Sequence, residues 1–483
     1  MKTARALSIA FFLSLLSVSL CLSDTRLDEV RKKLREAGVP LMQEEWKLPV
    51  VPDSQNAAFA YKEAYELIVT DCNAACCTLT EVRRLKKYFP VTGLTPWQDV
   101  PPAVKKEVSQ LILTHQDFVG MYQLLERASE MPCVFRENGT WKLLPAFCDW
   151  GKMGELQVSS AVRTVVYAAG NKMVAEAEFG SPEKAVSACL MGMRMARALG
   201  NEPTNLAPTT RMVAVARIVA AMRDILGKIP PEKLPAETVL PLIDALRQER
   251  NEHPAFENLK AYATMESVYR FAQFRKQGEG AFVFTDEDRE CIARDLPEEL
   301  RALTEETERK NKEFLREAWK ASGIPSAQEF FDAVETYVLE QFAACAPYTC
   351  QPFWTARPHL EEVVRQAEQT AAEKQFLRGF VYANGLSRFC EREARYDASL
   401  GIAELVLACR AYRHRHGRYP SSLEALVPDY LFEMPVDPFT GKPFVYQRRF
   451  AGFAVISVGE NLTNDGGREE WNGRPDIVWR FSR

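Results

Sequence analysis

Apolar residues recur at the spacing of an amphipathic α-helix along most of this chain, from about residue 25 to residue 392. The clearest predicted helices cover residues 159–180 and 181–200, and a third follows from about 208 to 226. Strand-like alternation of apolar and polar residues is clearest after residue 440. The pattern therefore predicts a mainly α-helical protein with a small sheet in the last part of the chain.

The junction between the first two of these helices has residues that helix ends prefer. Ser181 suits the N-cap of the second helix, and Pro182 suits its first helical position, where the missing N–H is not needed. Both helices are rich in alanine, which indicates close packing, and the short turn resembles the helical hairpins of solenoid proteins. No convincing repeat period is present, so we expect a hairpin-like or solenoid-like scaffold without regular repeats.

Two more helices are predicted in the second half of the chain. Residues 297–323 place Glu, Lys and Arg at spacings that favour a solvent-facing helix, and residues 359–386 are predicted to form another. This stretch lacks the Gly, Ser and Pro composition of a mobile linker. We therefore expect the helical part, residues 24–395, to dock onto the C-terminal part of the chain.

Residues 396–483 have a different pattern from the rest of the chain. Gly417 is placed to cap a long helix, while Ser421 and Glu424 form a capping box for a short helix that Pro428 stops. Asp-Pro and Thr-Gly pairs predict a turn, and three short segments alternate like strands. The predicted order is long helix 396–417, short helix 421–428, turn 436–443 and strands 443–447, 452–458 and 475–481.

This order of elements resembles the globular domain of the major pseudopilin of type II secretion systems. The motifs that carry the resemblance are HGRYPSSLEALVPDYL at 416–431, MPVDPFTGKPFVYQ at 434–447, SVG at 457–459, NDGG at 464–467 and DIVW at 476–479. The resemblance implies a small α+β domain with a three-stranded antiparallel sheet over residues 396–483. Pseudopilins also carry a packing helix behind a short basic leader, and this chain lacks that arrangement, so a module used for contact is expected rather than a pilus subunit.

The family resemblance also implies a calcium site in the loop before the last strand. Asn461 falls where the family has an aspartate, and Asp465 and Asp476 supply carboxylates, the hard oxygen ligands that calcium prefers. The loop is longer than in the family, and Glu469 and Glu470 have no clear counterparts. An ordinary solvated loop is the alternative.

Residues 1–23 have the layout of a secretory signal peptide. Lys2 and Arg5 precede an apolar stretch at 6–20, which is shorter than the ~20 residues that a spanning helix needs. Acylation of Cys21 is the alternative use of this leader. We therefore expect an exported protein, periplasmic or in the cell envelope, with membrane contact only if Cys21 is lipidated or the leader is retained.

The composition argues against several classes of function. The formal net charge of −4 and the absence of a Lys/Arg-rich run give no reason to expect a nucleic-acid partner. The five histidines form no HExxH motif, and no GxSxG, P-loop or dinucleotide-binding glycine pattern is present. No catalytic residues are therefore predicted.

Twelve cysteines raise the question of disulfides, which an exported protein can form. Cys345 and Cys350 lie in a short proline-containing break where a local bridge is sterically reasonable. Cys72, Cys76 and Cys77 have the spacing of one helix face. Their spacings do not match a zinc site, and buried thiols in a helical core are the alternative to pairing.

Together these observations predict an exported, non-enzymatic envelope protein. A helical scaffold carries a pseudopilin-like module that contacts a protein partner, in association with type II secretion or a related surface apparatus. The alternative is an exported hydrolase or ligand-binding protein with its site in the helical region.

Overall fold

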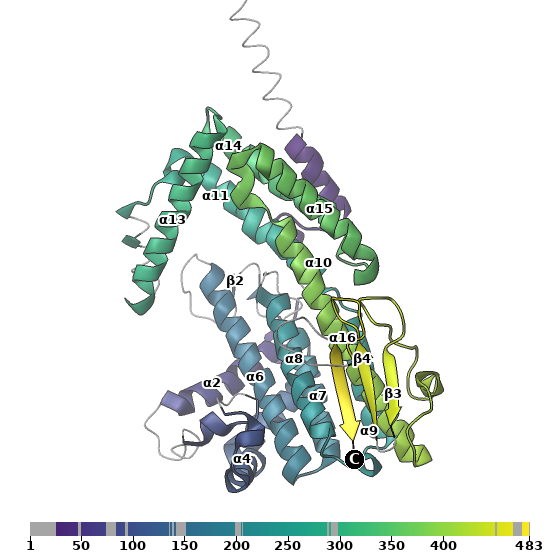
Figure 1. Cartoon of the computed structure of the whole chain (residues 1–483). Helices are drawn as coiled ribbons and strands as arrows, with labels where there is room; N and C mark the ends of the chain where they lie inside the picture. Colours follow the sequence, from purple (N-terminus) through teal and green to yellow (C-terminus); the bar gives the residue numbers. More distant parts are fainter. Residues whose placement is uncertain are drawn as a thin grey trace, which may run out of the picture. The chain divides into compact units, whose positions relative to one another are not determined.

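The protein is mainly α-helical and carries a small antiparallel sheet near the end of the chain, as the sequence predicts (Figure 1). A computed structural model describes residues 26–46, 50–73, 84–91, 95–134, 136–137, 140–141, 151–198, 204, 206–286, 289–290, 298–449, 452–466 and 476–482. The predicted signal peptide lies outside these ranges. Within them, no helix combines the length and the apolar character needed to cross a bilayer.

The chain divides into two compact units, and each is assembled from separate stretches of sequence. Unit 1 consists of Met1–Lys47, Ala255–Gln351 and Thr355–Phe389, and unit 2 consists of Leu48–Pro254, Pro352–Trp354 and Cys390–Arg483. Helix α16, Ala383–His416, includes residues assigned to both units. The predicted boundary between residues 395 and 396 falls inside this helix.

Unit 1 is built from helices at its described positions. They are the helix at 26–36, η1 Gln43–Glu45, α10 from Pro254 to Ala261, the π-helix Tyr262–Tyr269, α11 Arg270–Gln277, η8 Gly278–Phe282, α13 Glu298–Ser322, α14 Ala327–Cys345, η9 Ala346–Tyr348, α15 from Phe353 to Glu373, η10 Gln375–Phe380 and the start of α16. Helix α13 confirms the charged helix predicted at 297–323.

The single helix predicted at 359–386 is wrong, because the chain breaks between α15 and α16. The break has a specific cause in the side chain of Gln341 on α14. Its Oε1 accepts hydrogen bonds from the backbone N–H of Tyr382 (2.8 Å) and Ala383 (3.0 Å), and its Nε2 donates to the carbonyl of Phe380 (2.9 Å). Gln341 therefore satisfies backbone groups at the start of α16, as an N-cap residue does in other helices.

Unit 2 begins with helices that pack on one another. They are η2 Asp53–Gln55, α2 Ala57–Asn73, η3 Lys86–Tyr88, η4 Trp97–Asp99, α4 Pro102–Thr114, α5 Gln116–Ala128, α6 Gly151–Phe179, α7 Pro182–Arg197, α8 Leu206–Leu226, η6 Pro231–Lys233 and α9 Ala236–Arg250, with the short paired strands β1 Arg136–Glu137 and β2 Thr140–Trp141 between α5 and α6. Helices α6, α7 and α8 lie side by side (Figure 1).

The start of α7 confirms the prediction made for it. Ser181 is the N-cap and accepts a hydrogen bond from the backbone N–H of Lys184, and Pro182 is the first helical residue. Close packing of these helices is also confirmed: a Cβ atom at Gly192 of α7 would lie 3.1 Å from the Cβ atom of Ala169 on α6 and would overlap Ile218 on α8. The small residues predicted to allow close approach therefore do so.

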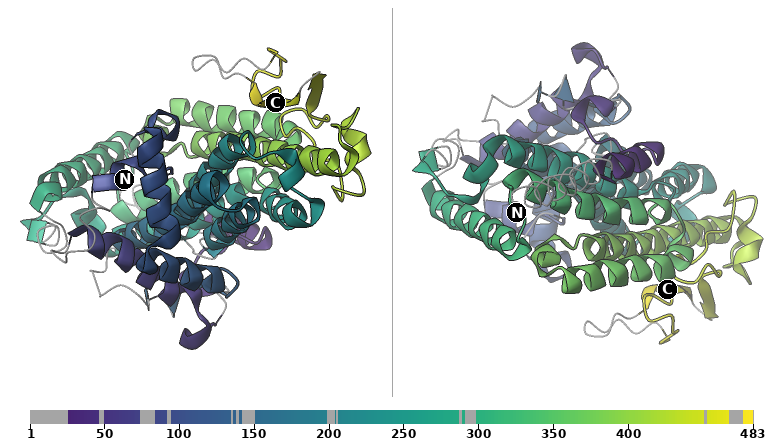
Figure 2. Two further views of the ribbon diagram at one scale, coloured as in Figure 1. Left: turned by 90° about the horizontal axis from the view of Figure 1, so that it is seen from below. Right: turned by 90° about the horizontal axis from the view of Figure 1, so that it is seen from above.

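The end of unit 2 contains the predicted three-stranded antiparallel sheet. Strands β3 Val445–Arg449, β4 Gly452–Ser457 and β5 Ile477–Ser482 pair in that order, and they lie near the last turns of α16 (Figures 1 and 2). Tyr446, Phe453 and Phe481 share one face, because Phe453 pairs with Phe481 and with Arg448, two residues along from Tyr446. The rings of Phe453 and Phe481 stack with centroids 5.5 Å apart.

The turns between these elements agree with the sequence in two places and differ in one. Gly417 has a φ of +68° and caps α16, and the predicted turn at 436–443 is closed by a hydrogen bond from the Asp437 N–H to the carbonyl of Lys442. The capping box at Ser421 is wrong. The short helix is the 3₁₀ helix η11, Leu423–Leu426, and Ser422 takes the N-cap position instead.

Candidate functional site

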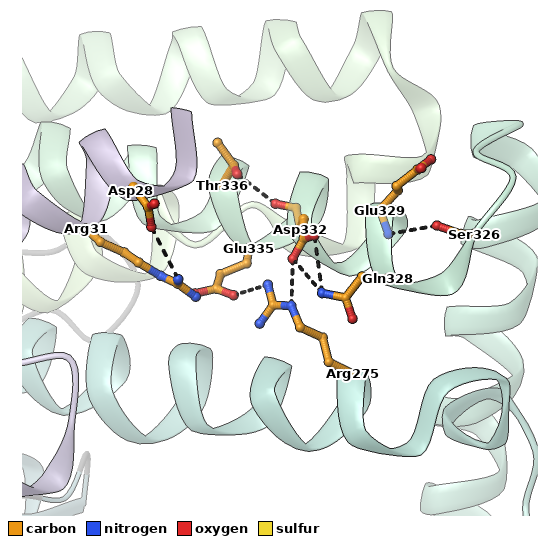
Figure 3. Close-up of polar contacts among 9 residues, drawn as sticks. All are labelled: Asp28, Arg31, Arg275, Ser326, Gln328, Glu329, Asp332, Glu335 and Thr336. Atoms are coloured by element: carbon orange, nitrogen blue, oxygen red, sulfur yellow. Dashed lines mark hydrogen bonds and ion pairs between the residues drawn. The ribbon is translucent and has the colours of Figure 1, made fainter. Parts of the chain in front are cut away.

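The structure gathers charged side chains into two buried clusters, one in each unit, and the first joins three helices of unit 1. Its centre is the fully buried carboxylate of Glu335 on α14. One oxygen, Oε1, accepts a hydrogen bond from Arg31 Nη2 of the helix at 26–36 (2.7 Å). The other, Oε2, accepts from Arg275 Nη2 of α11 (Figure 3). The carboxylate therefore lies between two guanidinium groups.

Asp332, one helical turn before Glu335, completes this cluster. Its Oδ1 accepts hydrogen bonds from Arg275 Nε (2.6 Å) and from Gln328 Nε2 (3.3 Å) (Figure 3). Burial lowers the pKa of Arg275, but the charges and hydrogen bonds of Glu335 and Asp332 outweigh it, so that the net pKa is raised. Each charge has an opposite partner, which is the arrangement of a structural ion-pair network.

The second cluster surrounds Glu249, at the C-terminal end of α9 in unit 2. Arg211 of α8 binds both carboxylate oxygens, with Nε–Oε1 at 2.8 Å and Nη2–Oε2 at 2.7 Å. Arg197 of α7 donates to Oε2 (3.2 Å), and the hydroxyl of Tyr396 on α16 donates to Oε1 (2.8 Å). Burial raises the pKa of Glu249, but Arg211 and the other donors outweigh it, and the net pKa is lowered.

Asp397 extends this cluster along α16, but the acidic groups around it are less well matched by basic groups. Burial raises the pKa of Asp397 well above its ordinary value, and the carboxylate charge of Glu393 adds to this effect more than the nearby Arg250 opposes it. The guanidinium of Arg250 instead donates to Glu404 (2.9 Å). The Oδ1 atom of Asp397 is buried and has no hydrogen-bond partner among the described residues. The raised pKa makes Asp397 easier to protonate than an ordinary aspartate.

The three residues predicted to bind calcium are placed in different environments. Asn461 and Asp465 lie together in the exposed loop after β4, with Asn461 Nδ2 donating to Asp465 Oδ2 (2.7 Å), and Asn461 Oδ1 accepts from the N–H of Thr463 (2.9 Å). Asp476 is buried just before β5. Glu469 and Glu470 lie outside the described residues.

Asp437 is a structural carboxylate that the site prediction missed. Its Oδ1 accepts from the N–H of Phe439 (3.0 Å), and its Oδ2 accepts from the N–H of Val458 (2.9 Å), so it ties the turn at 436–443 to the end of β4. Burial raises the pKa of Asp437; the hydrogen bonds from Phe439, Val458 and Ser457 oppose the rise without cancelling it, and the charge of Asp476 adds to it. The Asp-Pro pair in the predicted turn was the available sequence signal.

Neither metal ligation nor disulfides are seen among the groups that are described. In the ranges given above, no three His, Cys, Asp or Glu side chains gather in a way that would hold a metal ion. The local bridge between Cys345 and Cys350 is wrong: both are thiols, and burial raises the pKa of Cys345 to about 12. Cys345 lies inside the last turn of α14, while Cys350 is exposed. Cys76 and Cys77 lie outside the described residues.

Comparison with known proteins adds no second source of information about these clusters. No family model, no curated protein and no solved structure matches the chain. The pseudopilin resemblance of residues 396–483 therefore rests on the motifs quoted above, and it stays a prediction.

Proposed function

We propose that this chain is an exported, non-enzymatic envelope protein whose helical scaffold carries a pseudopilin-like module for contact with a protein partner. In this proposal the partner belongs to a type II secretion system or a related surface apparatus. Two observations support the proposal: apolar side chains are exposed within residues 396–483, and buried carboxylates of the scaffold are paired with guanidinium groups.

The observation that carries the proposal is the exposure of Phe432, which follows η11. Its side chain is 79% exposed, and Val427 nearby in the sequence is also exposed. The guanidinium carbon of Arg247 lies 5.2 Å from the centre of the Phe432 ring, a distance suited to a cation–π interaction. A ring ordered in this way loses little further freedom on binding, which is typical of aromatic anchors at protein interfaces.

Leu462, in the loop after β4, is a second exposed apolar side chain. It is 51% exposed and has a φ of +58°, a left-handed conformation that costs a leucine about 1–2 kcal/mol. The hydrogen bond from the N–H of Thr463 to the side chain of Asn461 helps to hold this turn. Local backbone strain of this kind is concentrated at binding sites.

The buried charges support a structural role better than a catalytic one. Glu335 and Asp332 in unit 1, and Glu249 in unit 2, accept hydrogen bonds from guanidinium groups in every case. The oxygens of these carboxylates are occupied by guanidinium donors, which is the arrangement of structural ion pairs. The scaffold is therefore proposed to hold its helices together with these groups.

The proposal includes a calcium ion bound in the module by oxygen atoms of Asn461, Asp465 and Asp476, the residues that the pseudopilin resemblance assigns. The short distance between Asn461 and Asp465 supports a joint role for these two side chains. A calcium ion in this loop would fix the segment that presents Leu462.

Site-specific photo-cross-linking in cells tests the proposed function. A photoreactive amino acid at position 432 or 462 should give one discrete adduct with an envelope protein. The matched control is the same amino acid at Asp429, an exposed polar position three residues before Phe432. Equal labelling at all three positions, or none at any, would contradict the proposal.

Asp397 is the observation that favours the alternative, an exported hydrolase or ligand-binding protein, because a carboxyl group with a raised pKa is one feature of general acids. The purified chain can be assayed on chromogenic ester, peptide and glycoside substrates. Turnover that Asp397→Asn abolishes, while Asp429→Asn retains it, would favour the enzyme.

A further inference from the structure

Arg410 of α16 is a buried cation, and its surroundings in unit 2 are unusual. The residue is 3% exposed. Its Nη2 donates a hydrogen bond to the backbone carbonyl of Ile229, and its guanidinium carbon lies 5.7 Å from the centre of the Phe481 ring on β5. A carbonyl oxygen and an aromatic face stabilise a cation only in part.

In the described part of the chain, Arg410 has no ion-pair partner of the kind that normally neutralises a buried guanidinium. Among the described residues, no carboxylate lies within ion-pair distance of it, although Arg211 and Arg275 each have two. Its Nε atom is also buried and has no hydrogen-bond acceptor in the described part of the chain. Buried charges in proteins are paired or coordinated, and a buried donor without an acceptor destabilises the fold.

A second guanidinium lies one helical turn further along α16. Arg413 is on the same face as Arg410, because residues three apart on a helix are neighbours. It lies 4.7 Å from the centre of the Tyr419 ring and is partly exposed, and its nearest acidic group is the exposed carboxylate of Glu232, at 3.9 Å. Arg413 therefore has a loosely held carboxylate partner, and Arg410 shares the same helix face.

The net pKa of Arg410 is lowered to about 10, mainly by burial; Tyr419 and the carboxylate of Glu232 oppose this change, and the charge of Arg413 adds to it. The guanidinium nevertheless stays charged at neutral pH. Its positive charge is therefore present in the folded protein and needs an anion.

We propose that Arg410 and Arg413 form a binding site for a small oxyanion, such as inorganic phosphate. Arg410 donates its Nε hydrogen to one oxygen, and Arg413 adds charge and a second donor at the partly exposed side, where the ion enters. The burial of Arg410 favours a small free ion over the surface of a macromolecule. Planar guanidinium groups are well suited to oxyanions because they donate parallel hydrogen bonds.

The test uses the full chain without its leader in a chloride buffer at constant ionic strength. Inorganic phosphate is titrated while binding is followed by calorimetry and thermal unfolding, with sulfate and acetate titrated separately to compare tetrahedral anions with a carboxylate. We expect saturable binding and a rise in the unfolding midpoint. Arg413→Gln should weaken binding about tenfold or more, as expected from the loss of one charge-assisted hydrogen bond.

Arg418→Gln is the matched control, because Arg418 is an exposed arginine just beyond the same helix. It should bind phosphate like the unmodified chain. Arg410→Met should abolish binding. If that variant does not fold, Arg413→Gln decides the matter, since its side chain is at the edge of the site. No saturable binding by the unmodified chain, or equal binding by Arg413→Gln and Arg418→Gln, would overturn the proposal.

Discussion

Arg211 binds both carboxylate oxygens of Glu249, and both side chains are buried between the helices of unit 2. The two residues are 38 positions apart in the chain and belong to α8 and α9. A bidentate pair of this kind fixes the relative orientation of the two helices, because both donors and both acceptors must align.

Glu249→Gln should lower the free energy of unfolding by about 3–5 kcal/mol, because it leaves the guanidinium of Arg211 buried without its counter-ion. Glu252→Gln is the control. Glu252 lies 3.7 Å from the same guanidinium but is about half exposed, so its loss should change stability by less than about 1 kcal/mol. Urea unfolding at pH 7 measures both. Similar losses for the two variants would show that burial does not determine how much the Arg211–Glu249 pair contributes to the free energy of unfolding.

Asp397 should make the protein less stable as the pH rises. A carboxyl group with a raised folded-state pKa contributes stability below its unfolded pKa, and this contribution is lost as the pH rises through the folded-state pKa. At high pH the Asp397→Asn variant should therefore be more stable than the unmodified chain. The gain should reach about 1.4 kcal/mol for each unit by which the folded-state pKa exceeds the unfolded-state pKa. Urea unfolding from pH 4 to 9 measures this, and Asp429→Asn should show no such gain.

Arg31 and Arg26 offer a matched pair of ion-pair deletions on the helix at 26–36. Arg31 contacts the buried Glu335 at 2.7 Å, whereas Arg26 contacts the partly exposed Glu340 at 2.6 Å. Arg31→Ala should cost about 1.5–3 kcal/mol, the range for hydrogen bonds to charged groups, and Arg26→Ala less than about 1 kcal/mol. Chemical denaturation measures both losses. The reverse order would contradict the role given to the Glu335 cluster.

Alanine substitutions at Gly441 and Gly466 distinguish the cost of backbone strain from the cost of steric overlap. Both have a positive φ, of +68° and +73°, but a Cβ atom at Gly441 would lie 2.7 Å from Cε2 of Trp354, whereas the space around Gly466 is open. Gly466→Ala should cost about 1–2 kcal/mol from conformation alone. Gly441→Ala should cost a further 1–3 kcal/mol or so from overpacking. Thermal unfolding of both variants checks the difference, and equal losses would show that Trp354 moves aside without cost.

Calcium should raise the thermal midpoint of the full chain in a saturable manner if the proposed loop site forms. Asp465→Asn should abolish the rise, because it removes a carboxylate from the proposed ligands. Asp286→Asn, at an exposed aspartate of unit 1, should leave it unchanged. A midpoint that is the same in calcium and in chelator would show that residues 459–466 form an ordinary solvated loop.

The elements that the sequence predicted correctly are those specified by neighbouring residues. Helix α7 begins where Ser181 and Pro182 predict, since a cap acts within one turn. The three strands appear where side chains alternate, and the turn at 436–443 forms where its Asp-Pro pair predicts.

The features that sequence reasoning missed depend on residues far apart in the chain. The break before α16 depends on Gln341, about 40 positions upstream, and no local composition marks it. Likewise, the sequence around Glu249 resembles an ordinary charged helix surface, because its partner Arg211 is 38 positions away in the chain. Arg410 was also missed, because the burial of its Nε atom without an acceptor among the described residues is visible only once its surroundings are known.

The assembly of each unit from separate stretches has a consequence for how the chain is made. Unit 2 needs both its early helices and residues 390–483, and unit 1 needs the helix at 26–36 together with Ala255–Gln351. Synthesis delivers these stretches at different times, in order from the N-terminus. The apolar faces of the early helices therefore stay unburied until the later stretches of the chain that cover them have been made. Neither unit can therefore close until most of the polypeptide has been synthesised.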